Sequence, residues 1–440
     1  MKKITRDMKK SYVLGAGISG LSAGYATGLD VIEAEDLPGG ICSSYYIKPG
    51  EKKRLSRSPS DGEAYRFEVG GGHWFFGAGV EALDFIHRFS GTKKYIRRSS
   101  VYLSKEKTLI PYPIQNNLRF LKKESADRAL KELIKGPGRA PSIMKDWLAQ
   151  NFGKTLCGLF FYPFNRLYTA DLYGKIAPQD PYKSPVDISL GLQGAYKKVH
   201  SVGYNAAFVY PKGGLDKFIG KIANKCHVVC KKRVIRIDTK KRIIHFQDGS
   251  AQAYRALIST LPLNRMMEMT KLKVSAKPDP YTSVLVLNIG AVRGSACPRE
   301  HWLYVPHSKS GFHRVGFYSN VERSFLPRSS RKTNDRVSIY VERAYARNDK
   351  PTAKEVEIYT KLVIKELKEW GFIKDVEALD ATWIDVAYTW SWPGSKWRER
   401  AIDALKKQNI YQTGRYGKWK FQGVADSILD GLRSKRYLLS

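Results

Sequence analysis

Short apolar runs separated by polar turns recur along the chain, and several of them lead directly into segments with helical spacing. Tyr12–Leu14 is such a run, and it precedes a stretch in which Leu21 and Tyr25 stand four residues apart. A spacing of four places two side chains on one face of a helix. A second run, Asp30–Ala34, follows. The pattern predicts a strand, a helix and another strand, the unit from which parallel sheets are built.

The remainder of the chain continues this mixture. Asn117–Gly153, Leu215–Lys225 and Ala353–Trp370 combine charged residues with the apolar spacing of helices. Apolar runs rich in β-branched residues predict strands at His227–Asp238, Ile243–Phe246, Ala256–Thr260, Tyr281–Ile289 and Val337–Val341. Ile410–Leu432 again has a strand followed by a helix, and the polar, basic segment Ile47–Glu63 predicts a surface loop. An α/β protein is expected.

Glycines mark the first strand-to-helix turn. Gly15, Gly17 and Gly20 form a G-x-G-x-x-G pattern between the first apolar run and the helical stretch. Gly15 permits the tight turn, Gly17 lets backbone amides approach a pyrophosphate, and Gly20 lets the helix pack against the strand. The anion then lies at the positive end of the helix. Gly414-Arg415, before the C-terminal helix, offers a second place of this kind, where an arginine adds bidentate contacts.

A carboxylate stands at the end of the second predicted strand. Glu33 lies thirteen residues after Gly20, where an acidic side chain can accept both hydroxyls of an adenosine ribose. The same charge repels a 2′-phosphate, so FAD or NAD is favoured over NADP. Gly39 and Gly40 follow directly and indicate backbone packed closely against a ligand.

Composition excludes several classes of protein. The chain has 440 residues, of which 42% are hydrophobic and 12% aromatic, so it is globular rather than disordered. Lys and Arg number 76 against 41 Asp and Glu, a formal net charge of +35. Such a balance favours anionic partners: nucleic acid, anionic membranes or phosphorylated small molecules. The basic residues are spread in short clusters and form no tail, which argues against a dedicated nucleic-acid arm.

Five scattered cysteines are too few for a disulfide framework, and Cys226 and Cys230 have no second pair at zinc spacing. We expect reduced thiols, no metal site and a cytoplasmic protein. The basic Met1–Lys10 and the small, apolar Ser11–Ala26 imitate a signal peptide, but glycines interrupt the apolar run. No signal peptide and no transmembrane helix are therefore expected.

With the three glycines and His73 of Phe67–Gly77 (FEVGGGHWFFG), the chain resembles the flavoprotein superfamily of amine oxidases, protoporphyrinogen oxidases and UDP-galactopyranose mutases. Within it, five segments resemble the eukaryotic type of UDP-galactopyranose mutase: Pro111–Leu118, Asn205–Gly214, His301–Pro306, Phe312–Asn320 and Gly414–Phe421. The resemblance implies a Rossmann-like, discontinuous FAD-binding domain with inserted helical and antiparallel-sheet substrate domains. We place the FAD domain at residues 1–92, 201–264 and 401–440, a mainly helical insertion at 93–200, and a sheet-rich substrate domain at 265–400.

The chemistry that this resemblance implies is an isomerisation. In such mutases N5 of reduced FAD attacks the anomeric carbon of a nucleotide sugar and expels the diphosphate, and the sugar recloses between its pyranose and furanose forms. NADPH or NADH is the expected reductant, a UDP-galactose-like nucleotide sugar the expected substrate, and cell-surface glycan biosynthesis the expected setting. The protein's part is chiefly positioning and charge stabilisation.

The resemblance also assigns residues. Arg314 matches the arginine that clamps the diphosphate, Tyr304 and Tyr388 match tyrosines that donate to it, and His73 matches the histidine beside the flavin. Substrate contacts are implied for Gln115, Lys175, Asn205 and Phe421. FAD contacts are implied for Gly15, Gly17, Ser19, Gly20, Glu33, Ala34, Gly39, Gly40, Ser43, Gly71, Gly72, Val234, Gly414 and Arg415.

One segment departs from the mutase pattern. Where such mutases continue Arg-Tyr-Glu-Val-Gly-Asn, this chain has Lys420–Ala425, so Phe421 replaces a tyrosine hydroxyl and the final amide is missing. A lost charge-assisted hydrogen bond costs roughly 1.5–3 kcal/mol. Two other functions therefore stay open. One is a flavin oxidoreductase of the amine oxidase or protoporphyrinogen oxidase type. The other is a non-catalytic flavoprotein that binds polyanions or an anionic membrane surface.

Overall fold

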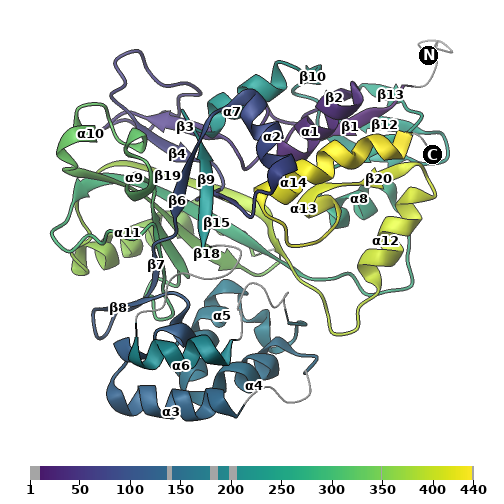
Figure 1. Cartoon of the computed structure of the whole chain (residues 1–440). Coiled ribbons are helices and arrows are strands. Elements are labelled where there is room, and N and C mark those ends of the chain that lie inside the picture. The colour runs from purple at the N-terminus through teal and green to yellow at the C-terminus, as the bar shows by residue number, and fades with distance from the viewer. Residues whose placement is uncertain (1–9, 136–140, 179–186, 198–205, 348, 439–440) are drawn as a thin grey trace.

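A five-stranded parallel sheet holds the glycine-rich turns in the computed structural model, which describes residues 10–135, 141–178, 187–197, 206–347 and 349–438 (Figure 1). Its order is β10-β2-β1-β14-β20. The strands are β10 (Val228–Val229), β2 (Asp30–Ile32), β1 (Tyr12–Leu14), β14 (Leu257–Ser259) and β20 (Ile410–Gln412). All four pairings are parallel, so the carboxyl ends of the strands meet at one edge of the sheet.

Apolar layers cover both faces of this sheet. In β1, Val13 belongs to one hydrophobic cluster while Tyr12 and Leu14 belong to another, as alternation along a strand requires. The first cluster includes the helices α1 (Ile18–Thr27), α2 (Val80–Phe89), α7 (Leu215–Ala223) and α14 (Val424–Leu432). The second includes α8 (Leu263–Thr270), α12 (Trp397–Lys406) and the antiparallel strands β11 (Val234–Asp238) and β12 (Ile243–Phe246), which continue to β13 (Ala251–Ala253).

A seven-stranded sheet forms the second body of the molecule, in the order β19-β15-β18-β17-β16-β7-β8. Every pairing in it is antiparallel except that of β16 with β7. Its strands are β7 (Ser99–Leu103), β8 (Thr108–Pro111), β15 (Tyr281–Arg293), β16 (Trp302–Tyr304), β17 (Arg314–Phe317), β18 (Arg336–Tyr345) and β19 (Ile373–Thr389). The helix α11 (Ala353–Glu369) covers one face, and its buried Tyr359, Val363 and Leu367 join the cluster beneath it. The short α9 (Tyr318–Val321), the 3-10 turn Arg323–Phe325 and α10 (Ser330–Thr333) follow β17.

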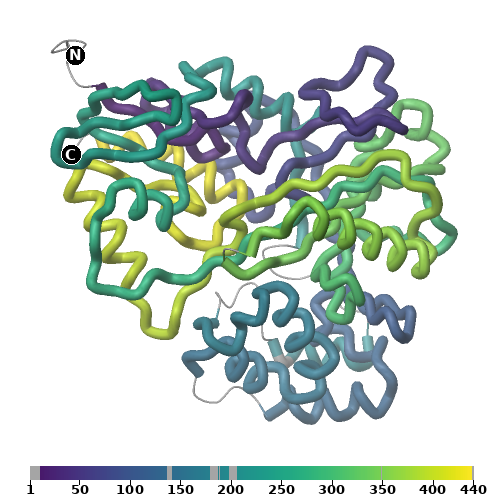
Figure 2. The backbone as a smooth tube through the Cα atoms, turned by 180° about the vertical axis from the view of Figure 1, so that it is seen from behind, coloured from purple at the N-terminus to yellow at the C-terminus, as the bar shows by residue number. Residues whose placement is uncertain are grey.

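Helices between residues 114 and 197 form a separate layer, the helical lobe, at the bottom of Figure 1 and again in the reverse view of Figure 2. It comprises 3-10 turns at Ile114–Asn116, Leu118–Phe120 and Leu172–Gly174, with α3 (Lys123–Ile134), α4 (Met144–Leu156), α5 (Tyr162–Tyr168) and α6 (Ile188–Tyr196). A π-helical turn, Cys157–Phe161, joins α4 to α5. Its inner face is aromatic: Phe152, Phe160 and Phe161 are buried.

Two small sheets connect these bodies. One pairs β3 (Ser44–Ile47) with β4 (Tyr65–Glu68), and the other has the order β5-β9-β6, with β5 (Phe75–Phe76), β9 (Ala207–Pro211) and β6 (Thr92–Ile96). The loop between β3 and β4 is the predicted surface loop, and it is tied down at several points. Arg54 donates from Nη2 to Asp380, and Ser329 donates through its backbone and its hydroxyl to Glu63.

The predicted fold class is confirmed. Most predicted elements are present with ends shifted by up to four residues, the largest shifts being at the ends of β15 and β18. The predicted strand His227–Asp238 is instead two strands in two sheets, β10 and β11, because the chain turns at Lys231 with φ 60°. The interval 93–200 is not helical from its start: β7 and β8 belong to the seven-stranded sheet. The domain boundaries stay a prediction.

Candidate functional site

The glycine-rich turns meet at the carboxyl edge of the parallel sheet. Gly15 follows β1 with φ +90°, and a Cβ on Gly20 would lie 1.8 Å from the Gly15 carbonyl oxygen, so α1 approaches the turn as closely as glycine allows. By contrast, a Cβ on Gly17 would meet no atom within 4 Å. The backbone at Gly17 therefore faces open space at the N-terminus of α1, where an anion is stabilised.

Glu33 is fixed beside this turn. Its Oε2 accepts a hydrogen bond from the Ala16 backbone nitrogen at 2.6 Å, and its Oε1 accepts one from Glu35 at 2.9 Å. The side chain is 8% exposed. Each carboxylate oxygen can accept a further hydrogen bond. The Glu33 carboxylate can therefore still accept hydrogen bonds from ribose hydroxyls while the loop around the expected pyrophosphate site fixes its position.

A cavity of about 510 Å³ extends from the glycine turns into the centre of the molecule. Eight of the predicted FAD residues line it: Gly15, Gly17, Ser19, Gly39, Gly40, Gly72, Gly414 and Arg415. Six lie outside its lining: Gly20, Glu33, Ala34, Ser43, Gly71 and Val234. Gly20, Glu33 and Gly71 support lining residues from behind, whereas Val234 lies on β11 in the neighbouring small sheet.

The cradle fits a dinucleotide cofactor. Gly39 and Gly414 have φ +126° and +72°, and a Cβ on Gly414 would lie 2.4 Å from Ser19 Oγ. Three turns from different parts of the sequence thus converge without side chains at the N-termini of α1 and α13 (Gly414–Gly417). Backbone amides and helix ends without intervening side chains are what a pyrophosphate requires.

His73 lines the cavity next to this cradle. Its Nδ1 lies 3.1 Å from the Gly71 carbonyl oxygen, which only accepts, so Nδ1 carries the hydrogen. Burial lowers the pKa of His73 to about 4. The ring is therefore neutral near pH 7, with Nε2 as an acceptor.

The middle of the cavity contains a charged cluster around Glu342. Nη2 of Arg314 donates to both carboxylate oxygens, Tyr388 donates its hydroxyl to Oε2 at 3.2 Å, and His313 Nε2 lies 3.5 Å from the same oxygen. Burial by itself would raise the pKa of Glu342, but Arg314 and His313 together outweigh it and the pKa falls to about 2. Burial lowers the pKa of His313. The cluster is thus an ion pair with a neutral imidazole.

Arg314 keeps hydrogen-bonding capacity for a ligand. Its Nε is buried and has no hydrogen-bond partner in the described part of the chain, although Nη2 is engaged by Glu342. The side chain is 25% exposed and lines the cavity. A guanidinium has five donors, so one nitrogen can hold the carboxylate while the others contact an anion.

Aromatic rings from the helical lobe close the far end. The Tyr304 ring lies 4.6 Å from that of Tyr112 and 5.4 Å from that of Phe164, and the Tyr168 ring lies 4.7 Å from that of Tyr388. Lining residues from the lobe are Met144, Trp147, Leu148, Phe160, Phe161, Phe164, Asn165 and Tyr168. This end of the cavity therefore suits a flat or apolar group rather than a strongly hydrated one.

Arg415 and Phe421 lie at the junction between the two ends. The Arg415 guanidinium carbon is 4.7 Å from the Phe421 ring centroid and 5.5 Å from that of Tyr388. Its Nη1 and Nη2 donate to the carbonyl oxygens of Gln422 and Ala387, both at 3.2 Å. The Phe421 ring supports a cation by its face but offers no donor of its own.

The remaining predicted substrate residues are not in the cavity lining. Gln115 is 3% exposed within the helical lobe, and Lys175 is exposed to solvent. Asn205 lies outside the described residues. The structure therefore brings together Arg314, Tyr304, Tyr388, His73 and Phe421. Gln115 and Lys175 stay apart from them.

Sequence reasoning missed Glu342, His313, Asn165 and Tyr168, all of which line the cavity. The sequence does mark Glu342, because it is an acidic residue at the end of the apolar run of β18; in the structure it is 1% exposed. A buried carboxylate needs a partner, and Arg314 is opposite it in the register of β17 and β18. The aromatic residues of α5 had none, since they are spaced like any buried helix face.

This fold and cradle define a protein that binds a dinucleotide cofactor at the carboxyl edge of a parallel sheet. The family profile described as flavin-containing amine oxidoreductase matches residues 16–438. The chain belongs to that family, which implies a flavin cofactor, FAD. The glycine turns, Glu33 and Arg415 are the residues that would hold it.

Solved structures share the fold. The chain superposes on a reduced UDP-galactopyranose mutase with a TM-score of 0.81 and 22% identity, covering 98% of this chain and 96% of that one. A putative protoporphyrinogen oxidase from Exiguobacterium sp. 255-15 gives a TM-score of 0.70 at 13% identity, covering 99% and 100%. A putrescine oxidase bound to putrescine gives 0.57 at 14%, covering 98% and 99%.

No helix in the described part of the chain is long and apolar enough to cross a membrane. Among the described residues, no group of three or more His, Cys, Asp or Glu has the arrangement of a metal site. All five cysteines are free thiols.

Proposed function

We propose that this protein is a FAD-dependent mutase that interconverts the pyranose and furanose forms of a nucleotide sugar of the UDP-galactose type. The observation that carries the proposal is the continuity of one cavity from the glycine cradle to Arg314, Tyr304 and Tyr388. A cation and two hydroxyls opposite the flavin place suit a diphosphate that leaves and returns. The similarity to a UDP-galactopyranose mutase in fold supports this choice.

The chain's own residues have separable roles in this proposal. Arg314 stabilises charge on the diphosphate through its free nitrogens while Glu342 holds its plane, because the register of β17 and β18 places the two side by side. Tyr304 presents a hydroxyl from β16, and neutral His73 accepts a hydrogen bond beside the flavin place. Rings from α4 and α5 exclude water, which protects a reactive sugar.

When bound and reduced, the flavin supplies the nucleophile that such an isomerisation needs. We propose NADPH or NADH as the reductant and the cytoplasm as the compartment. Five free thiols are consistent with a reducing compartment.

The test is anaerobic turnover. Purified protein is reduced with dithionite, mixed with UDP-galactofuranose, and the mixture is separated by chromatography. We expect UDP-galactopyranose with reduced protein and none with oxidised protein, because an isomerase consumes no electrons but needs the reduced cofactor. Flavin bound in stoichiometric amount with no product in either state would overturn the mutase assignment.

A specific observation favours a second candidate, a flavin oxidoreductase acting on a small organic substrate. Glu342 neutralises Arg314, and the far end of the cavity is lined with aromatic rings, so the site also suits a substrate with little charge. The two proposals differ in one readout. An oxidoreductase substrate bleaches the oxidised flavin under anaerobic conditions, whereas a nucleotide sugar leaves its spectrum oxidised.

A further inference from the structure

Seven basic side chains lie at the amino edge of the parallel sheet, opposite the cavity. We call this surface the basic edge. All seven are exposed or partly exposed, and they are Lys10, Lys240, Lys241, Arg242, Arg255, Lys406 and Lys407. The basic edge thus contributes seven positive charges to the net charge of +35, and these charges lie outside the flavin site.

Backbone hydrogen bonds show that these residues are neighbours in space. The Arg255 nitrogen donates to the Lys10 carbonyl at 2.8 Å, and the Tyr254 nitrogen donates to the Arg242 carbonyl at 2.9 Å. The Leu257 nitrogen donates to Asn409, two residues after Lys407, at 2.9 Å. Three strand starts and the turn between β11 and β12 therefore meet at one end of the molecule, near both termini in Figure 1.

The basic edge is remote from the cavity. Strands β1, β14 and β20 begin at the basic edge and end one or two residues before Gly15, Thr260 and Gly414, which line the cavity. Each strand has three residues and so spans about 10 Å. Since the sheet and its covering helices stand between, these cations do not contact a substrate in the cavity.

The seven charges of the basic edge outnumber the carboxylates close to them, although Asp238 interacts electrostatically with Lys241. None of the seven side chains forms an ion pair with another described residue, whereas Lys232 and Arg233, before the other end of β11, pair with Asp248 and Glu35. Of the carboxylates close by, Asp30 accepts from His227, Asp238 accepts from the Lys241 backbone, and Asp403 is exposed on α12. A positive potential therefore extends from this surface into solvent.

We propose that the basic edge docks on an anionic membrane surface. Five of its seven residues are lysines, which attract lipid headgroups as point charges without demanding a fixed geometry. Nucleic acid is the less suitable partner, because the large exposed hydrophobic residues of the described chain include only two aromatics, Phe120 and Tyr196, and both lie on the helical lobe. Bases therefore find no ring to stack on beside these cations.

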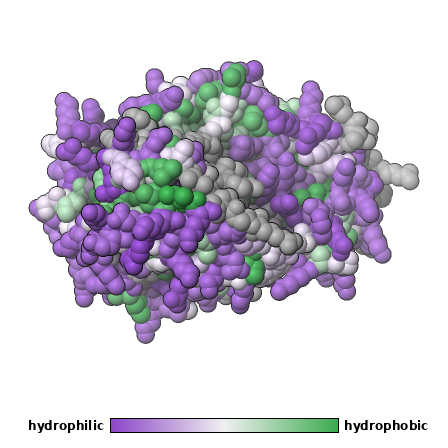
Figure 3. Space-filling model, turned by 60° about the horizontal axis from the view of Figure 1, so that its bottom comes forward, coloured by the Kyte–Doolittle hydropathy of each residue, from purple (hydrophilic) through white to green (hydrophobic). Residues whose placement is uncertain are grey.

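Large apolar side chains are sparse at this surface: of those exposed in the described chain, only Ile235 on β11 belongs to the β11–β12 hairpin. Figure 3 shows hydrophobic residues gathered into patches on the face that brings the helical lobe forward, and the exposed Ile134, Leu192 and Tyr196 belong to that lobe. Docking at the basic edge is thus electrostatic, and it has to weaken as salt screens it. Docking that rests on surface charge alone is also reversible.

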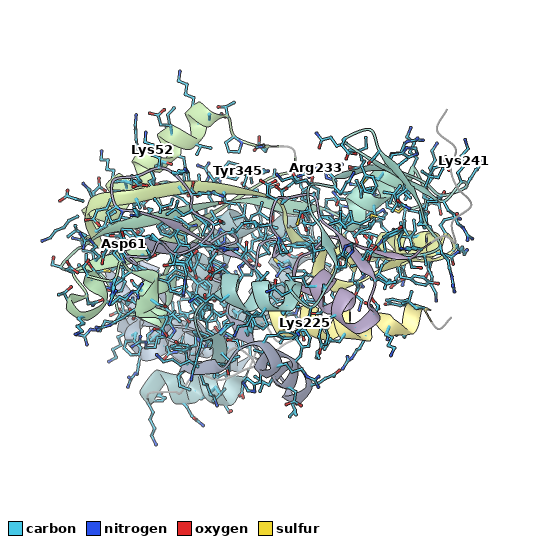
Figure 4. The ribbon with its side chains drawn as sticks, turned by 90° about the horizontal axis from the view of Figure 1, so that it is seen from above. Lys52, Asp61, Lys225, Arg233, Lys241 and Tyr345 are labelled. Atoms are coloured by element: carbon cyan, nitrogen blue, oxygen red, sulfur yellow. The ribbon has the colours of Figure 1, made fainter. Side chains whose placement is uncertain are left out.

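The test compares two triple charge reversals with the same net charge. Lys240→Glu, Lys241→Glu and Arg255→Glu change the basic edge; Lys52→Glu, Lys53→Glu and Arg57→Glu change the loop before β4. Figure 4 shows Lys241 and Lys52 at opposite ends of the molecule. Binding of the full chain with its flavin is measured by co-sedimentation with phosphatidylcholine vesicles, with and without phosphatidylserine. Flavin absorbance confirms that both variants are folded.

We expect binding to phosphatidylserine vesicles only, lost at high salt. Each basic residue near such a surface contributes about fivefold in affinity, so the basic-edge variant should bind roughly a hundredfold more weakly. The loop variant should change little. Equal loss of vesicle binding in both variants would overturn the proposal, since binding would then depend on net charge and not on the position of the charges. Tighter binding to an RNA or DNA oligonucleotide than to vesicles at equal salt would overturn it too. Mutase turnover in solution is independent of either result.

Discussion

Arg314 and Glu342 are cross-strand partners at the centre of the cavity, and one guanidinium nitrogen donates to both carboxylate oxygens, the longer contact being 2.6 Å. The carboxylate is 2% exposed and has one further donor, the Tyr388 hydroxyl. Such a pair places a cation in the site together with its own counter-charge. An anionic ligand that contacts Arg314 must then approach a fixed carboxylate as well.

Replacing Glu342 should separate affinity from catalysis. In Glu342→Gln the repulsion between the carboxylate and an anionic ligand disappears, so UDP should bind several-fold more tightly to the oxidised protein. Stability should fall by about 1–3 kcal/mol, because the buried part of Arg314 loses its counter-charge. Turnover should fall, since the arginine is no longer held in plane. Calorimetric UDP titration and urea unfolding measure the first two effects.

Tyr388→Phe is the matched control for this experiment. It removes one neutral donor from Glu342 and one hydroxyl from the substrate end but leaves the ion pair, so UDP affinity should not rise and stability should drop by about 1 kcal/mol. If Glu342→Gln instead weakens UDP binding, the carboxylate acts mainly by positioning the Arg314 side chain. Repulsion between the carboxylate and the anionic ligand would then not limit affinity.

The two glycines of the first turn allow flavin binding to be tested apart from folding. A Cβ at Gly17 meets no protein atom, and its φ of −66° suits alanine. Gly17→Ala should therefore leave the apoprotein as stable as the wild type, while flavin retention falls at least tenfold because the methyl group occupies the pyrophosphate place. The flavin-to-protein ratio and the melting temperature of the apoprotein give both readouts.

Gly20→Ala should behave differently. Its Cβ would lie 1.8 Å from the Gly15 carbonyl oxygen, so α1 has to move away from β1. We expect loss of both stability and flavin. A Gly17→Ala protein that retains its flavin fully would show that the pyrophosphate lies elsewhere.

These results separate what a sequence can predict from what it cannot. The flavin cradle was predictable because each of its glycines is needed within a few residues of a strand end. The spacing of Gly15, Gly17 and Gly20 along the chain therefore determines the geometry of the turn. Fold class followed from the same local signals together with the order of strands and helices.

The substrate end was less predictable because its contacts join distant parts of the chain. Glu342 meets Arg314 only through the register of two strands, and Tyr168 meets Tyr388 across more than two hundred residues. The resemblance found Arg314 and Tyr304 but also included Gln115 and Lys175, which the helical lobe places outside the cavity lining. The residues next to Gln115 and Lys175 in the sequence do not indicate that these two side chains lie outside the cavity while Arg314 and Tyr304 line it.

Glu68 should make stability depend on pH. It is fully buried, and burial raises its pKa to about 8 although Arg66 opposes the shift and Tyr210 and Ser44 donate to its carboxylate. In the unfolded chain an ordinary glutamate titrates near 4.3. Its folded form thus keeps a proton that the unfolded form loses, so the contribution of Glu68 to stability is fully present below about pH 4.3 and declines as pH rises toward 8.

The expected slope from this group is at most about 1.4 kcal/mol per pH unit between those pKa values. Glu68→Gln, which mimics the protonated acid, should flatten the dependence. Asp84→Asn, at an exposed position on α2, should leave it as it is. Urea unfolding at pH 5, 7 and 9 measures all three proteins. A wild-type slope unchanged by Glu68→Gln would contradict the raised pKa.

Substitutions of Phe421 test the mutase proposal most directly. Its ring lies against Arg415 at the junction of the flavin and substrate ends. In Phe421→Tyr a hydroxyl is added to the cavity without loss of the ring face, so the cation–π contact is kept. If a diphosphate passes this point, the new donor should tighten UDP binding about tenfold, the range expected for a hydrogen bond to a charged group.

Phe421→Leu separates the two contributions of the ring. It keeps an apolar side chain but removes the face that supports Arg415, so it should weaken UDP binding a few-fold and leave the melting temperature within a few degrees of wild type. Product formation by reduced Phe421→Tyr, compared with reduced wild type, then decides whether the hydroxyl acts in the transition state. An increase in turnover larger than the gain in affinity would show that it does, while equal binding by all three proteins would place the diphosphate away from this ring and favour the oxidoreductase.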